Sequence, residues 1–239
     1  MIASYQALSP TDAQSISSTR NGLNVGSVGV TRDGRVYRWS LAGGSNLAPG
    51  KINVAATVNA DATNKTVART YAANTKQVII DAGGAISANT YQDGYLTIND
   101  ATGEGTTAAV VGNSATSGAA ELTVNLYEPI PVALTIDVSE ASLTQHPYSG
   151  VVVSVADQLD MAVGIANVAI TAAYYGWVQT RGVCAGLADE SYAIGQELVI
   201  GSSIVGALEA HDAAGEQTVA VAIVAGVDTE YREVFLNID

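Results

Sequence analysis

Short runs in which apolar and polar residues alternate cover most of the chain from residue 31 onward. In ELTVNLYEPI (121–130), two leucines and a valine share one side at a spacing of two, opposite threonine, asparagine and tyrosine. That spacing is typical of a half-buried strand. Such runs recur roughly every ten residues between turn residues, which predicts a mainly β fold: a β-sandwich or β-barrel of short antiparallel strands. We expect less than about a fifth of the chain in helix.

The pattern divides the chain into three expected segments. Residues 1–30 are rich in Ser, Asn, Thr and Gly, so they predict an extended N-terminal arm that is ordered only by packing on another surface. Residues 31–140 are expected to form a β-rich domain, and residues 141–239 a small C-terminal β-barrel. The arm would wrap a neighbouring subunit through its spaced apolar residues, which are Leu8, Ile16, Leu23 and Val25.

The clearest local signal is Asp33-Gly34, which separates VGVTR from RVYRWSL. Asp-Gly between two β-rich runs predicts a hairpin with a two-residue turn. In the second run Tyr37, Trp39 and Leu41 occupy alternate positions, so one face of the strand is aromatic and apolar. This strand is therefore expected to be half buried.

Composition and charge narrow the class of partner. Of the 239 residues, 48% are apolar and 14% are charged, which is enough for a sizeable core. No apolar run approaches the roughly 20 residues of a membrane span. The first residues lack the basic and apolar regions of a secretory signal, so we expect synthesis in the cytoplasm. The net charge of −13 is the sum of +5 over residues 1–76 and −18 over residues 77–239. An acidic body argues against nucleic acid, whereas the basic leading segment suits an acidic protein surface.

Few side chains suggest catalysis. A thiol nucleophile needs a neighbouring base, and sequence position brings neither His146 nor His211 to Cys184, the single cysteine. We therefore interpret Cys184 as a small apolar core residue. A triad of His211, Asp212 and a serine can be assembled only on paper, because no nucleophile-elbow motif is present.

Metal and cofactor motifs are weak. Asp93, Asn99, Asp100 and Glu104 offer oxygen ligands at loop positions, so a calcium site over 93–104 stays open. Their spacing matches no calcium loop, and Asn, Asp and Gly form turns without a metal. The chain has no zinc-site or phosphate-loop spacing, so we expect no cofactor.

Five stretches, in order across residues 25–239, resemble a class of virion structural proteins of tailed bacteriophages. They are DGRVYRWSLAGGSNLAPGK, YQDGYLTINDATGEG, HPYSGVVVS, YYGWVQTRGVCAGL and AGVDTEYREVFLNID. Proteins of that class are taken for head or capsid-associated proteins encoded near the major capsid protein. The last hundred residues also look like the small β-barrel of capsid decoration (cement) proteins, with a turn of the G-x-x-L-x-x-G type over Gly195–Gly201. The resemblance carries over no catalytic residue.

The resemblance implies a structural, non-enzymatic role in the virion. The expected function is capsid decoration: a homotrimer, made in the cytoplasm of the bacterial host, that stabilises the head by binding the lattice of the major capsid protein. Neither nucleic acid nor membrane is expected as a partner. The candidate interface residues are Arg32, Arg35, Arg38, Tyr37, Trp39, Tyr174, Tyr175 and Trp177.

Two alternatives stay open. The first is another virion component: the major capsid protein, whose fold needs a long helix that the pattern lacks, or a tail, spike or adhesion protein that binds a host glycan. Glycan binding would need exposed aromatic residues beside a carboxylate, such as Tyr91, Asp93 and Tyr95. The second alternative is a glycan hydrolase with a pair of carboxylates, although nothing in the sequence pairs two of them.

Overall fold

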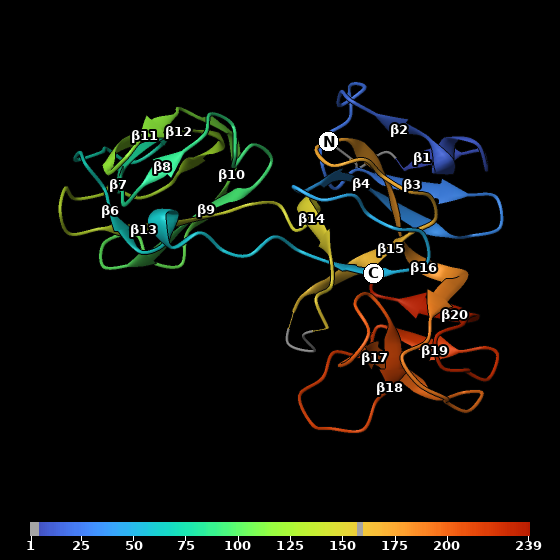
Figure 1. Ribbon diagram of the computed structural model, residues 1–239. Coiled ribbons are helices and arrows are strands. Elements are labelled where there is room, and N and C mark those ends of the chain that lie inside the picture. Colours follow the sequence, from blue (N-terminus) through green and yellow to red (C-terminus); the bar gives the residue numbers. More distant parts are fainter. Residues whose placement is uncertain (1–4, 157–159) are drawn as a thin grey trace. The chain divides into compact units, whose positions relative to one another are not determined.

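The computed structural model describes residues 5–156 and 160–239. The protein is mainly β, with 47% of residues in strands and 3% in helix, as the alternating pattern predicts. Two compact units are present (Figure 1). Unit 1 comprises residues 1–56 and 147–239, and unit 2 comprises residues 57–146. Unit 2 is therefore inserted into the sequence of unit 1.

Twelve strands and one 3₁₀ turn, Asp12–Gln14, belong to the described part of unit 1. The strands are β1 (Gln6–Leu8), β2 (Ile16–Ser17), β3 (Val28–Thr31), β4 (Val36–Ala42), β5 (Ile52–Val54), β14 (Ser149–Val153), β15 (Ala162–Ala166), β16 (Tyr175–Leu187), β17 (Glu197–Ile200), β18 (Leu208–Ala210), β19 (Ala220–Ala222) and β20 (Tyr231–Asn237).

Five of these strands close into a ring. Neighbours pair in the order β4, β14, β5, β15 and β16, and β16 returns to pair with β4. A closed ring leaves no open edge for pairing with another chain. The residues that fill it include Leu47, Val151, Val163, Ile170 and Val178, all buried.

The second half of β16 carries the rest of the sheet. It pairs with β20, which is followed by β19, β17 and β18. A bridge between Ala188 and Leu208 brings β18 back beside the end of β16, so this half is nearly closed as well. In Figure 1, the orange β16 lies between the blue strands β3 and β4 and the red strands β17 to β20.

A β-bulge in β16 lets this one strand serve both halves. Its pairing with β4 shifts register between Gln179 and Arg181, and Gly182 has a φ of +93°, which glycine adopts readily. The fully buried Gln179 donates from Nε2 to the carbonyl oxygens of Arg181 (3.1 Å) and Val183 (3.0 Å). Its Oε1 accepts from Asn167 Nδ2 at 2.9 Å. One side chain thus satisfies the backbone on both sides of the bulge.

Unit 2 has its own closed arrangement and its own core. Its sheet has the order β6, β13, β9, β10, β12 and β7, and a bridge between Val67 and Ile80 joins the two ends. Eighteen buried apolar residues of the described chain fill it, among them Leu96, Ile98 and Leu143. A 3₁₀ turn, Ala60–Ala62, precedes the first strand. The strands are β6 (Lys65–Thr66), β7 (Thr75–Ala82), β8 (Ala85–Ile86), β9 (Tyr95–Asp100), β10 (Thr107–Asn113), β11 (Thr116–Ser117), β12 (Ala120–Ile130) and β13 (Glu140–Thr144).

The point of insertion lies between two neighbouring strands of unit 1. Strand β5, which precedes unit 2, pairs antiparallel with β14, which follows it, and Val54 lies opposite Val152. Unit 2 therefore occupies the place of the loop in a hairpin. The expected boundaries at residues 30 and 140 do not coincide with this division, because the strands on either side of the insertion pair with each other across about 90 residues of chain.

The expected extended N-terminal arm is not confirmed. Residues 5–30 form short strands and turns that pack on their own chain: β1 pairs parallel with β3, and β2 pairs antiparallel with β16. Leu8 is buried beside Trp177 over Gly29, where a Cβ would lie 2.4 Å from Leu8 Cδ1. Val25 is buried too, whereas Ile16 is exposed. Backbone pairing and these contacts dock the segment within unit 1, and residues 1–4 lie outside the described residues.

The Asp33-Gly34 hairpin is confirmed, with a different turn. Strands β3 and β4 are antiparallel partners, and Thr31 N donates to Arg35 O at 3.0 Å. A two-residue type I′ turn needs a positive φ at both of its central positions. Gly34 has a φ of +84°, but the φ of Asp33 is not positive. The connection is thus a three-residue loop with glycine in the left-handed position.

Replacing Gln179 by leucine tests the role assigned to the bulge. Leucine has a similar size but leaves the carbonyl oxygens of Arg181 and Val183 without their donor, so we expect unit 1 to lose roughly 2–4 kcal/mol of unfolding free energy. Urea denaturation measures it. Gln77→Leu is the control: Gln77 lies in unit 2, and its exposed side chain donates to Asn125 Oδ1, so a change within about 0.5 kcal/mol is expected. A loss below about 1 kcal/mol for Gln179→Leu would contradict the role.

Candidate functional site

The aromatic residues expected at an interface are mostly core residues. Tyr37, Trp39 and Trp177 are buried and form one cluster with Leu8. The ring centroids of Trp39 and Trp177 are 5.1 Å apart. The cluster forms because β4 and β16 pair with Trp39 directly opposite Trp177. The expectation that these three residues contact a partner is therefore wrong.

The two remaining tyrosines differ from each other. Tyr175 is partly buried and its ring stacks on Trp39, with centroids 6.1 Å apart, so it extends the aromatic cluster. Tyr174 is exposed. Of the five predicted aromatic interface residues, Tyr174 alone keeps a surface large enough for a contact.

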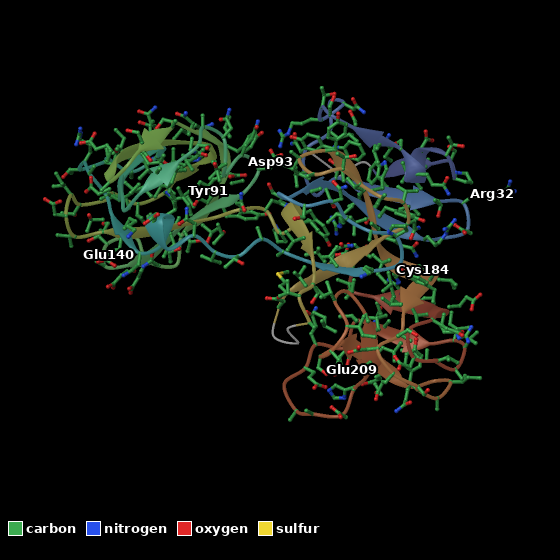
Figure 2. All side chains as sticks on the ribbon, viewed as in Figure 1. Arg32, Tyr91, Asp93, Glu140, Cys184 and Glu209 are labelled. Atoms are coloured by element: carbon green, nitrogen blue, oxygen red, sulfur yellow. The ribbon has the colours of Figure 1, made fainter. Side chains whose placement is uncertain are left out.

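The arginines of the hairpin separate into internal and outward groups. Arg38 Nε bonds Asp239 Oδ2 at 2.6 Å and the guanidinium lies over the ring of Tyr148, so Arg38 serves its own unit. Arg35 Nε bonds Asp33 Oδ2 at 2.8 Å. Arg32 is exposed at the outer end of the hairpin (Figure 2) and makes no ion pair with any described residue. Arg32 is the candidate that stays available to a partner.

An exposed apolar row crosses three neighbouring strands of unit 1. Val183 of β16 lies opposite Phe235 of β20, which lies opposite Val221 of β19. Their side chains point outward and are 46%, 40% and 36% exposed, respectively. We call these three residues the outer row. Next to it on β16 is Arg181, which is exposed and forms no ion pair within the described chain.

A groove of about 570 Å³ continues the outer row toward the hairpin. Val183, Phe235, Arg181 and Arg35 line it, together with Gly34 and Gly182. Asp33 lines it as well and pairs with Arg35, so the groove combines two apolar side chains, two guanidinium groups and one carboxylate. The sequence could not reveal this face, because β16 is apolar on both sides and its period of two does not tell which side is outside.

Cys184 faces the interior between these elements. It is buried in the core of the second half of unit 1, and burial raises the pKa of its thiol to about 12. A hollow of about 510 Å³ beside it is lined by Arg35, Asn167 and Tyr231 among others, and by no histidine or carboxylate. A thiol in this setting stays protonated at neutral pH, which agrees with its interpretation as a packing residue.

The structure brings together two carboxyl groups whose pairing could not be predicted from the sequence. Asp189 and Glu209 are in hydrogen-bond contact, and burial together with the neighbouring Asp189 raises the pKa of Glu209. Each also holds the loop before β18: Asp189 Oδ2 accepts from Ser203 N at 2.8 Å, and Glu209 Oε2 from Ser202 N at 3.0 Å. Glycosidase carboxyls stand roughly 5–9 Å apart across the substrate. This pair is closed on itself and is suited to fixing a loop.

The residues considered for calcium or glycan lie in unit 2 and are largely committed. Tyr91 and Asp93 are buried, so of that trio only Tyr95 presents a surface. Asp100 Oδ1 accepts from Ala101 N, and Asn99 bonds Asn64 and Ser142. Within the described residues, no three His, Cys, Asp or Glu side chains gather as a metal site would require.

Cys184→Ser tests the packing role of the thiol. A buried hydroxyl without a partner should cost about 1–3 kcal/mol of unfolding free energy, measured by urea denaturation. Cys184→Ala is the control, because it brings no polar group and should lose less. Wild-type Cys184 should react with a thiol reagent only after denaturation. Rapid labelling of the native protein would contradict this account.

Glu209→Gln tests the carboxyl pair. A folded-state pKa above the unfolded value contributes stability that is present at low pH and is lost as pH rises through the folded pKa. Glutamine keeps an acceptor for Ser202 and stays neutral, so the melting temperature of the variant should gain on that of the wild type as pH rises above about 4.3, the ordinary pKa of a glutamate. The exposed Glu233→Gln is the control. A difference between Glu209→Gln and wild type that does not change with pH would contradict the pairing.

None of the helical residues in the described chain forms a segment long and apolar enough to cross a membrane. Comparison with known protein families finds no family that matches this chain. Comparisons with curated proteins and with solved structures find no match either.

Proposed function

We propose that this protein is a structural component of a tailed-phage particle that decorates the capsid by binding the lattice of the major capsid protein. The observation that supports this role is the outer row, Val183, Phe235 and Val221, with its groove. An apolar strip of this kind on a closed sheet is a typical feature of a protein–protein contact.

Charge points to an acidic partner surface. Unit 1 carries fourteen carboxylates and seven basic residues, yet Arg32, Arg35 and Arg181 all gather around the hairpin and its grooves. Arginine side chains pair well with carboxylates at interfaces. Exposed ion pairs contribute only about 0–1 kcal/mol each, so the apolar row supplies most of the binding and the arginines supply orientation.

The architecture suits a dense array of copies. Unit 2 joins the two ends of its sheet, and unit 1 closes five of its strands into a ring, so few edge strands are left to pair wrongly with neighbours. Along β16 and β20, the outward pairs on either side of Val183–Phe235 are Arg181–Asn237 and Ala185–Glu233. The outer row therefore has Arg181 on one side and Glu233 on the other. Opposite charges on the two sides of one row allow copies to pair head to tail, as in the homotrimer we propose.

Capsid occupancy tests the proposal. Capsids that lack the protein are mixed with purified protein from low to about molar salt, and bound copies are counted by cryo-EM. Phe235→Ser should abolish most binding at every salt concentration because it interrupts the outer row. Arg32→Ala with Arg181→Ala should lower occupancy at low salt and flatten its salt dependence.

Ile194→Ser is the matched control, because Ile194 is an exposed apolar residue of unit 1 outside the outer row. Occupancy that is the same for wild type and Phe235→Ser would show that another surface attaches the protein. Absence of the protein from purified particles, as judged by mass spectrometry, would refute the role itself.

A further inference from the structure

Two exposed tyrosines stand in one row on the outer face of unit 2. Tyr95 of β9 lies opposite Ala109 of β10, and the pairing of Val110 with Leu126 places Tyr127 of β12 opposite Ala109 on its other side. Tyr95 is 37% exposed and Tyr127 is 46% exposed. We call Tyr95, Ala109 and Tyr127 the tyrosine row. Since the rings start two strand spacings apart, their bases are separated by roughly 10 Å.

Ala109 has the smallest side chain of the row. Its methyl group reaches far less from the sheet than the two tyrosine rings, so the surface dips between them, and we call this dip the trough. The Tyr95 ring is held in place because it stacks on His146, with centroids 6.0 Å apart. A ring that is already ordered loses less entropy when a ligand binds.

Hydroxyl groups border the trough on one side. Ser142 and Thr107 lie opposite Thr97 on either side of it, in the next outward-facing row. Thr97 Oγ1 and Thr107 Oγ1 are 3.0 Å apart, which leaves each hydroxyl further capacity to donate or accept. Glu128, next to Tyr127, has the opposite parity along β12, and its carboxylate accepts from Ala109 N at 2.9 Å. The two rings and the hydroxyls of Thr97 and Thr107 therefore share the outer face.

We propose that the tyrosine row binds a neutral oligosaccharide of at least two pyranose units. A pyranose ring has an apolar C–H face that packs on an aromatic ring and a rim of hydroxyls that exchange hydrogen bonds with the hydroxyls of Thr97 and Thr107. Unit 2 carries nine carboxylates and three basic residues, so its net negative charge disfavours an acidic sugar.

The experiment uses the full-length protein and three neutral probes: maltohexaose, cellohexaose and chitohexaose, with oligogalacturonate as the acidic comparison. Titration is followed by NMR and by calorimetry. We expect at least one neutral probe to bind at millimolar concentrations or below. Tyr95→Ala and Tyr127→Ala should each weaken binding by about five- to tenfold or more, equivalent to ~1–1.4 kcal/mol. Tyr174→Ala is the control, since Tyr174 is a tyrosine of the same exposure in unit 1.

Ala109→Leu separates a sugar site from a merely apolar surface. Leucine fills the trough while it adds apolar area, so the variant should lose sugar binding, whereas attachment of a protein by general apolar contact would be kept or strengthened. Both tyrosine variants change exposed side chains, and NMR dispersion checks that unit 2 is folded.

Three results would overturn the proposal. They are no binding of any neutral probe, binding that Tyr95→Ala and Tyr127→Ala leave unchanged, and stronger binding of oligogalacturonate than of neutral sugars. Sedimentation that shows dimers lost in the tyrosine variants would make a second copy the occupant and would also refute it. Capsid attachment is unaffected by these outcomes, because the outer row belongs to unit 1.

Discussion

The side-chain amide of Gln179 stabilises the β-bulge in β16, the strand that both halves of the sheet in unit 1 share. Without a bulge at Gly182, β16 would continue its pairing with β4 and could not turn its second half to β20. A bulge exposes backbone carbonyls inside the protein, and an apolar side chain at 179 could not satisfy them. The ring of five strands, the nearly closed second half and the outward direction of Val183 all follow from this local arrangement.

The same bulge explains why core and surface residues alternate differently along β16. Before it, Trp177 and Gln179 are both buried, because one faces the aromatic cluster and the other faces the polar network with Asn167. After it, residues of the same parity, Arg181 and Val183, face solvent. The exposed outer row thus arises where the strand leaves the closed ring and is covered on one side only.

The features that could be predicted from the sequence are those that depend on residues close together in the chain. The mainly β class, the hairpin at Asp33-Gly34 and the aromatic face of β4 follow from spacing within about ten residues, and the structure has them. The pairing of β4 with β14 and of Asp189 with Glu209 could not be predicted, because neither depends on neighbours in sequence. The tyrosine row was missed for a related reason. Tyr95 and Tyr127 are 32 residues apart and meet only through β10.

The insertion of unit 2 between β5 and β14 couples the synthesis of the chain to the assembly of unit 1. Strand β4 is made early, but its parallel partner β14 emerges about a hundred residues later. As an unfolded loop, the intervening segment would oppose that pairing through its chain entropy, which increases with the logarithm of length. Once unit 2 has folded, its two ends are fixed, and the loop to be closed shrinks to a few residues on each side. Domains generally fold as units during synthesis, so we expect a folded unit 2 to favour the closure of unit 1, and a defect confined to unit 2 to slow it.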